Sequence, residues 1–350
     1  NPTVRAMVRR WLTLSKRTLY KLNLNIKTYI IGGKIMLKVA MLSKWHVHAG
    51  GYASQLKNSG KVEIVAVWDD DKERGENWAK ELGCEFIPCL DTLLAREDIE
   101  AVICDTPTTA HHDILVKAAK AGKHIFTEKA LCPTVAECLD VKKAVEEAGV
   151  TFCISYPQRG RPSVQFAKRM LDEGAFGKVT FVRVRDAHNG VSGNWLPDYW
   201  FDKDAAAGGA MMDLGCHPMY LLAYFLGKPK RVTGMFTAPF GMPVDENAVA
   251  VAEFEGGALG VGETGFISVG SPQTLEIYGT EGSLIAHDED VKFTSKKLSG
   301  IFNGFVKPDL PRPKESPLMQ FVDACINKTG SPKDLGIDDA IALTELLENS

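Results

Sequence analysis

Residues 101–130 read AVICDTPTTAHHDILVKAAKAGKHIFTEKA and contain one strand–helix–strand unit. The unit begins with the apolar run 101–105, continues with a helical pattern over 111–122, and ends with a second apolar run at 124–127. Strands that alternate with helices in this way form parallel sheets covered on both faces. The stretch therefore predicts a βαβ unit of an α/β domain.

The same alternation extends on both sides of this unit. It predicts strands at 38–43, 62–68 and 151–154, and helices at 49–59, 72–83 and 134–149. The last helix starts with a capping box, because Glu137 follows Thr134 by three residues. We therefore expect an N-terminal, doubly wound Rossmann sheet over residues 36–155, with its ligands at the carboxyl ends of the strands.

The pattern changes after residue 155. A helix at 164–173, a strand at 178–187 and a helix at 208–227 precede strand-like segments between 232 and 293, with a hairpin signal at 255–258 (EGGA). Residues 156–315 are therefore predicted to form a substrate and oligomerisation domain of the α+β type, with a large, mostly antiparallel open sheet. Two C-terminal helices are expected within 316–350, near 316–327 and 338–349.

Composition limits the classes of function. The chain has 350 residues and a net charge of −3, which gives no support to a nucleic-acid partner. Its eight cysteines form no C-x-x-C pair and several lie in apolar runs, as expected for buried thiols in a reducing cytoplasm. No apolar run approaches the ~18 residues that would suggest a membrane span. Residues 1–35 are basic without any acidic residue, which fits either an appended arm or sequence upstream of a start at Met36.

The turn after the first strand departs from a standard dinucleotide loop. In the stretch SKWHVHAGGY (43–52), the three positions of G-x-G-x-x-G hold Ser43, Trp45 and His48. Larger side chains should narrow the phosphate loop, although His46, His48 and the helix amides could still meet an anion. After the second strand, Asp69 is placed to bind ribose hydroxyls and repel a 2′-phosphate, which favours NAD over NADP. The alternative for Asp69 is a helix N-cap cluster without a ligand.

Further chemistry-bearing residues follow other strands. Thr106-Pro107-Thr108 forms a polar turn after the fourth strand, and Glu128 and Lys129 follow the fifth. Desolvation at this edge could lower the pKa of Lys129. Asp213 and His217, spaced i and i+4, are predicted to share one helix face, where the carboxylate would orient the imidazole as a general base. A solvated Glu–Lys pair and a structural Asp–His contact are the alternatives.

These segments, taken in order, resemble the Gfo/Idh/MocA family, the group of glucose-fructose oxidoreductase and inositol dehydrogenase. The resemblance covers residues 37–350 and rests on VAVWDDDKER (65–74), DTPTTAH (105–111), AGKHIFTEKA (121–130), QRGRP (158–162), GAFGKV (174–179), AGGAMMDLGCHP (207–218) and YGTEGSL (278–284). It implies a Rossmann domain and a second domain whose open sheet often serves oligomerisation, here as a homodimer or homotetramer. It also implies NAD(P)-dependent chemistry at a sugar or cyclitol carbon.

The resemblance assigns roles residue by residue. Lys129, Asp213 and His217 match the catalytic set, although Ala130 stands where the family has proline, and Arg159 matches an arginine beside the substrate crevice. Glu128, Thr106 and Pro107 match the nicotinamide side, and Asp69 matches the ribose carboxylate. The whole expected cofactor set is Ser43, Trp45, His46, His48, Asp69, Thr106, Pro107, Thr108, His111, Glu128 and Lys129.

The expected reaction is hydride transfer between NAD and a carbinol carbon of a small polyhydroxylated substrate. Arg159, Trp195, Tyr199 and Trp200 are the expected substrate contacts, and no metal is expected. Redox-assisted glycoside cleavage or epimerisation with recycled NAD remains open, as does a non-catalytic regulatory protein. A metal-dependent hydrolase is suggested by His46-x-His48 at a strand end, but the βα rhythm stops near residue 155, too early for an eight-unit barrel.

Overall fold

The computed structural model describes residues 36–298 and 304–350, so the predicted basic appendage lies outside the described residues. The first sheet has six parallel strands in the order β3-β2-β1-β4-β5-β6. Their bounds are β1 (Leu37–Leu42), β2 (Val62–Trp68), β3 (Glu85–Phe86), β4 (Ala101–Cys104), β5 (His124–Thr127) and β6 (Phe152–Ile154). This order is that of a Rossmann sheet and confirms the predicted class. Its switch point lies between β1 and β4.

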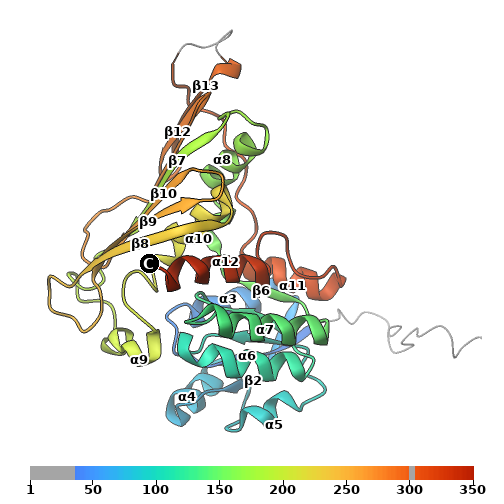
Figure 1. Cartoon of the computed structure of the whole chain (residues 1–350). Helices are drawn as coiled ribbons and strands as arrows, with labels where there is room; N and C mark the ends of the chain where they lie inside the picture. The colour runs from blue at the N-terminus through green and yellow to red at the C-terminus, as the bar shows by residue number, and fades with distance from the viewer. Residues whose placement is uncertain (1–35, 299–303) are drawn as a thin grey trace, which may run out of the picture. The chain divides into compact units, whose positions relative to one another are not determined.

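Helices connect these strands, mostly as predicted. They are α3 (Ala49–Ser59), α4 (Lys72–Leu82), α5 (Leu90–Leu94), α6 (His111–Lys120) and α7 (Val135–Ala148), and α6 packs beside α7 (Figure 1). The Thr134 side chain accepts the backbone N–H of Glu137 and completes the predicted capping box. The sequence did not predict β3 and α5, because two and five residues are too short for a periodic signal.

The second sheet has seven strands in the order β13-β12-β11-β7-β10-β9-β8, all antiparallel except for the parallel β7–β10 pair. Their bounds are β7 (Val179–Ala187), β8 (Pro229–Thr237), β9 (Asn247–Phe254), β10 (Leu259–Gly265), β11 (Thr274–Gly279), β12 (Gly282–His287) and β13 (Asp290–Ser295). α10 (Cys216–Leu226) packs on β7 and β10, and α8 (Pro162–Asp172) precedes β7. The predicted mostly antiparallel sheet is confirmed.

The two C-terminal helices pack on elements from both halves of the chain. α11 (Pro317–Asn327) contacts β6 and α3, whereas α12 (Ile337–Glu348) contacts α7, α10 and β8 (Figure 1). Their apolar faces belong to the main core. α12 therefore joins the first half of the chain to elements of the second half. In the part of the chain that the structure describes, no helix is long and apolar enough to cross a membrane.

The predicted helix over 208–227 was wrong in its first half. Both carboxylate oxygens of Asp245 accept backbone N–H groups, from Gly209 at 2.9 Å and Met211 at 2.8 Å, and the Asp245 carbonyl accepts from Ala210. These bonds hold a series of turns, so that α10 begins only at Cys216. Asp213 consequently lies before the helix and does not share a helical face with His217.

Gly209 fits this turn only because it lacks a side chain. A Cβ there would lie 2.6 Å from the backbone nitrogen of Asp245. Gly209→Ala should lower the free energy of unfolding by about 1–3 kcal/mol, the usual cost of overpacking, measured by urea denaturation. The matched control is Gly256→Ala, because a Cβ at Gly256 meets nothing within 4 Å. Equal stability of the two variants would contradict the role given to this turn.

Candidate functional site

A buried ion pair joins the end of β5 to the turn before α10. Lys129 Nζ lies 2.6 Å from Asp213 Oδ1 and donates a further hydrogen bond to the Asp213 carbonyl at 3.1 Å. Asp213 Oδ2 accepts from Trp200 Nε1 at 3.0 Å. The pair brings together residues that are 84 positions apart in sequence, and it fixes both side chains in one geometry.

This pairing shifts the pKa of Lys129 in the direction opposite to the one expected from the sequence. Burial alone would lower the pKa of Lys129, but the negative charge of Asp213, followed by the weaker effects of Cys216 and Glu128, raises it above its usual value. Burial opposes the charged form of Asp213 too, yet Lys129 lowers the pKa of that carboxyl to about 2. The expectation of a lowered lysine pKa was therefore wrong, and the site holds a charged lysine at neutral pH.

His217 lies near this pair but bonds elsewhere. Its Nδ1 is 3.0 Å from the hydroxyl of Tyr220, one turn further along α10, whereas the Asp213 carboxylate is held by Lys129 and Trp200. Burial, followed by the charge of Lys129, lowers the pKa of His217 to about 3. The imidazole is therefore neutral, and Tyr220 takes the orienting contact that the sequence assigned to Asp213.

A second cluster surrounds the buried carboxylate of Glu128. Its Oε1 lies 2.8 Å from His48 Nδ1 and 3.8 Å from His46 Nδ1, and it accepts a hydrogen bond from the Tyr52 hydroxyl. The Tyr52 hydroxyl also lies 2.7 Å from Ser155 Oγ. Sequence reasoning missed Tyr52 and Ser155. The i+4 spacing of Tyr52, on α3, from His48, its N-cap residue, was the available signal.

Charges in this cluster are set by burial and by Glu128. Burial lowers the pKa of His46 to about 3, against the opposing charge of Glu128. Burial also opposes the charged form of His48, but attraction to Glu128 outweighs it and raises the pKa of His48. The pKa of Glu128 lies well below its usual value, because its interactions with His46 and His48, and then the charge of Lys129, outweigh its burial. The cluster thus contains an ionised, fully buried carboxylate.

The altered turn after β1 contains one backbone conformation that a glycine usually supplies. Ser43, at the first glycine position, adopts a left-handed φ of 70°, and its Oγ accepts the backbone N–H of Trp45 at 3.1 Å. Asp69 Oδ2 accepts the backbone N–H of Lys44 at 2.8 Å, beside the same turn. Within the described part of the chain, no side chain caps the N-terminus of α3, and its first turn has no acidic residue, which leaves a suitable end for an anion.

The residues of this edge therefore fit a dinucleotide, because they offer a carboxylate at Asp69 and an uncapped helix start at α3. One contact was not expected from the sequence. Arg74 donates to Asp69 through both Nε and Nη2, the latter at 2.6 Å, and also reaches Asp70 at 2.8 Å. The guanidinium thus lies next to the carboxylate that was predicted to reject a 2′-phosphate.

The aromatic residues expected to bind substrate divide into two groups. Trp200 is buried and stacks on Trp45, with ring centroids 4.9 Å apart and planes inclined by 15°. Tyr199 is 46% exposed, and its ring lies 5.8 Å from that of Trp45. Trp195 is 53% exposed and contacts His188. Tyr199 and Trp195 can therefore present a ring face to a ligand, whereas Trp200 is engaged by Trp45.

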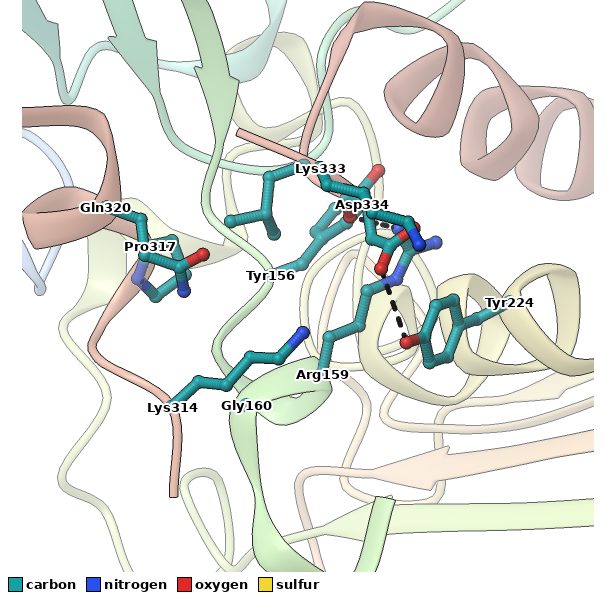
Figure 2. A pocket seen from close by; sticks show the side chains of 10 residues that line it. Tyr156, Arg159, Gly160, Tyr224, Lys314, Pro317, Gln320, Lys333 and Asp334 are labelled. Atoms are coloured by element: carbon teal, nitrogen blue, oxygen red, sulfur yellow. Dashed lines mark hydrogen bonds between the residues drawn. The ribbon is translucent and has the colours of Figure 1, made fainter. Parts of the chain in front are cut away.

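Arg159 lies in a different cluster (Figure 2). It is buried, pairs with Asp339, donates to the carbonyl of Asp334, and its guanidinium lies over Tyr224 at 4.6 Å. Its Nη2 donates to the carbonyl of Tyr220 at 3.3 Å. The structure therefore places Arg159 behind α10, joining it to the segment before α12, rather than beside Lys129.

The residues after β4 are largely buried. His111 bonds the carbonyls of Ala130, Leu131 and Thr106 at 3.0–3.1 Å and so ties together the loops that follow β4 and β5. Thr106, Pro107 and Thr108 are buried at the same edge. Sequence reasoning missed Asp105, which is fully buried with neither carboxylate oxygen hydrogen-bonded within the described residues. Burial, with the charge of Glu128 adding to it, raises the pKa of Asp105 well above its usual value.

Comparison with protein families gives two matches in chain order. Residues 28–156 match a model described as an oxidoreductase family with an NAD-binding Rossmann fold, named for GFO/IDH/MocA. Residues 164–285 match the GFO/IDH/MocA C-terminal domain. The boundary between the matches, 156 to 164, falls between the two observed sheets.

Two curated relatives are similar over 64% of the chain. The 2,7-anhydro-N-acetylneuraminate hydratase of Escherichia coli (strain K12) is 30% identical over 229 residues, and the scyllo-inositol 2-dehydrogenase (NAD(+)) of Bacillus subtilis (strain 168) is 32% identical over 233. The chain spans 60% and 66%, respectively, of the length of these two relatives.

Solved structures are similar over most of the chain. GenD2 from gentamicin A biosynthesis, in complex with NAD, is 26% identical with a TM-score of 0.75, covering 92% of this chain and 96% of that one. Levoglucosan dehydrogenase in complex with NADH and levoglucosan has a TM-score of 0.76 over 89% of this chain and 96% of that one. Its identity of 22% supports likeness of fold alone.

Asp213→Asn should strongly destabilise the protein, because it leaves the buried charge of Lys129 without its partner. Removing one member of such a pair typically costs about 3–5 kcal/mol. Because the pKa of Asp213 is lowered to about 2 when folded, its contribution is complete above about pH 4, the unfolded value, and is lost as the pH falls towards 2. The difference between wild type and variant should therefore shrink over that interval, measured by urea unfolding at several pH values.

The control is Asp172→Asn, which removes the carboxylate of an exposed i,i+4 pair with Lys168. Such pairs contribute at most about 0.5 kcal/mol. If Asp213→Asn were no more destabilising than Asp172→Asn at pH 7, the ion pair would not be a structural requirement of the site.

Proposed function

This chain belongs to the GFO/IDH/MocA oxidoreductase family, with its NAD-binding Rossmann fold, and from that premise we propose that it transfers hydride between NAD and a carbinol carbon of a sugar, cyclitol or glycoside. The observation that carries the proposal is the buried pair of Lys129 and Asp213, close enough to His217 for both charges to act on its pKa. A charged donor and a neutral imidazole at one strand edge suit the removal of a hydroxyl proton during hydride loss.

The cofactor would bind at the carboxyl ends of β1, β2 and β4. Bound NAD supplies the hydride acceptor or donor at its nicotinamide. Asp69 would accept hydrogen bonds from the ribose hydroxyls. The left-handed turn at Ser43 and the start of α3 would bind the pyrophosphate. Thr106 and Pro107, after β4, would line the nicotinamide side.

Lys129 and His217 would assist the transfer of the substrate's hydroxyl proton. Lys129 stays charged and would donate a hydrogen bond to the substrate oxygen, stabilising the alkoxide that develops as hydride leaves. His217 would accept the proton, but a pKa of about 3 makes it a weak base in this arrangement. Lys129 should therefore carry more of the rate enhancement than His217. Asp213 positions the ammonium group and keeps it charged.

A reaction without net redox is the second candidate. In that case NAD would be recycled within one catalytic cycle, as in redox-assisted glycoside cleavage or epimerisation. The observation in its favour is the relative named as a hydratase, because hydration transfers no net hydride. The two candidates differ in whether NADH accumulates, so NADH absorbance and sugar product should be followed together with scyllo-inositol, levoglucosan and D-xylose.

We also propose that the chain forms a homo-oligomer and is located in the cytoplasm. A homodimer or homotetramer through the second sheet is supported by apolar side chains exposed on its strands, among them Met235, Phe236 and Val251. A cytoplasmic location is supported by the cysteines, of which all eight are free and six are buried.

Asp69→Ala should weaken NAD⁺ binding and raise the ratio of NADP⁺ to NAD⁺ affinity at least about tenfold, or 1.4 kcal/mol. The variant removes the ribose acceptor and frees Arg74, which then can pair with a 2′-phosphate. Thermal shift with each nucleotide measures this. Asp98→Ala is the control, because Asp98 forms an exposed bidentate pair with Arg96. An unchanged nucleotide preference in Asp69→Ala would remove Asp69 from the cofactor site.

Lys129→Met should lower kcat about 10³-fold and His217→Ala about 10²-fold, both with near-normal NAD⁺ binding. The larger loss is expected for Lys129 because its charge acts directly on the developing alkoxide. Steady-state NADH formation measures kcat, and nucleotide thermal shift reports folding. His124→Ala, at the opposite end of β5, is the control with unchanged kcat. Full activity of Lys129→Met would refute the assignment.

A further inference from the structure

Three side chains from the expected cofactor edge, none of which takes part in the proposed proton transfer, meet after β1 and β5. One ring nitrogen of His46, one of His48 and one carboxylate oxygen of Glu128 all lie within 4.8 Å of one another. His46 and Glu128 are buried, whereas His48 is half exposed. The three residues come from two strand ends that are 80 positions apart in sequence.

The donor set is that of a transition-metal site. Two imidazole nitrogens and one carboxylate oxygen are ligands of Zn²⁺ and of the neighbouring divalent transition metals. Mg²⁺ and Ca²⁺ prefer oxygen donors alone, so the two imidazoles disfavour them. The ligand set therefore selects among cations by chemical class.

The charge balance around Glu128 favours a cation as well. The nearest buried ammonium, that of Lys129, is already paired with Asp213 at 2.6 Å. The carboxylate of Glu128 is fully buried. A divalent ion bound to it would supply positive charge in direct contact with this carboxylate.

A cavity gives access to the cluster. It has a volume of about 320 Å³, and its walls include His48, Tyr52 and Ser155, of which Tyr52 and Ser155 form the hydrogen-bond chain to Glu128. Three protein ligands leave at least one coordination position, which a water or a ligand entering through this cavity can fill.

We propose that His46, His48 and Glu128 bind one divalent transition-metal ion, for which Zn²⁺ is the probe. Binding requires small rearrangements. Ligation at His46 Nδ1 replaces the hydrogen bond from the His48 backbone N–H at 3.2 Å, and Tyr52 keeps its partner Ser155 at 2.7 Å. The site departs from the sequence-based expectation of no metal, and binding of the ion can be measured separately from hydride transfer.

The test is calorimetric titration of the full chain, treated with chelator, with ZnCl₂ and separately with MgCl₂. Cys89→Ser serves as the background, because Cys89 is an exposed competing thiol. We expect one Zn²⁺ per chain and no Mg²⁺ binding. His48→Ala should weaken Zn²⁺ binding at least about tenfold through loss of one ligand. Because His48 is half exposed, this variant should fold, and its thermal midpoint checks that it does.

Two further variants make the result specific. Glu128→Gln keeps the side-chain shape but removes the charge, and should weaken Zn²⁺ binding similarly. His112→Ala is the matched control, because His112 contacts Asp113 and Asp140 outside the cluster. Absence of Zn²⁺ binding to the parent chain, or equal binding by His48→Ala and His112→Ala, would overturn the proposal. NAD⁺ thermal shifts on chelator-treated protein test the proposed function separately.

Discussion

The buried ion pair of Lys129 and Asp213 sets the geometry on which the candidate site depends. The ammonium of Lys129 is buried and the carboxylate of Asp213 is largely buried, so the lysine without its partner would be costly. The end of β5 and the turn before α10 must therefore meet in one register. Asp213 reaches that position because Asp245 holds the turn through three backbone N–H groups. The second sheet, through the segment that leads into β9, thus positions a residue at the edge of the first.

Most of the fold could be predicted because the relevant signals are local. Buried parallel strands such as β4 and β5 are short apolar runs, and the capping box of Thr134 and Glu137 marks the start of α7. The beginning of α10 could not be predicted, because the residues of 208–215 are compatible with a helix. Their amides are instead taken by Asp245, more than thirty positions away, and no local pattern carries that information.

The candidate site divides in the same way. Strand ends place Asp69, Glu128 and Lys129 at one edge of a parallel sheet, and that inference needs only topology. Which groups bond one another is decided by tertiary contacts. The i,i+4 spacing suggested that Asp213 orients His217. In the structure Asp213 instead accepts a hydrogen bond from Lys129, and the imidazole contacts the Tyr220 hydroxyl. The same limit applies to Trp200. The sequence predicted that its ring contacts substrate, but in the structure the ring is stacked on Trp45.

The sheet order also explains how one edge can serve a dinucleotide and a cation. Asp69 follows β2 and Glu128 follows β5, with β1 and β4 between them, so the two carboxylates end strands about 14 Å apart at ordinary strand spacing. A dinucleotide that runs from the ribose carboxylate across the switch point passes the turn that carries His46 and His48. A cation held by those imidazoles and Glu128 would lie on the side of β1 away from Asp69. Its charge would then act on the pyrophosphate and nicotinamide half of the cofactor and leave the ribose contact unchanged.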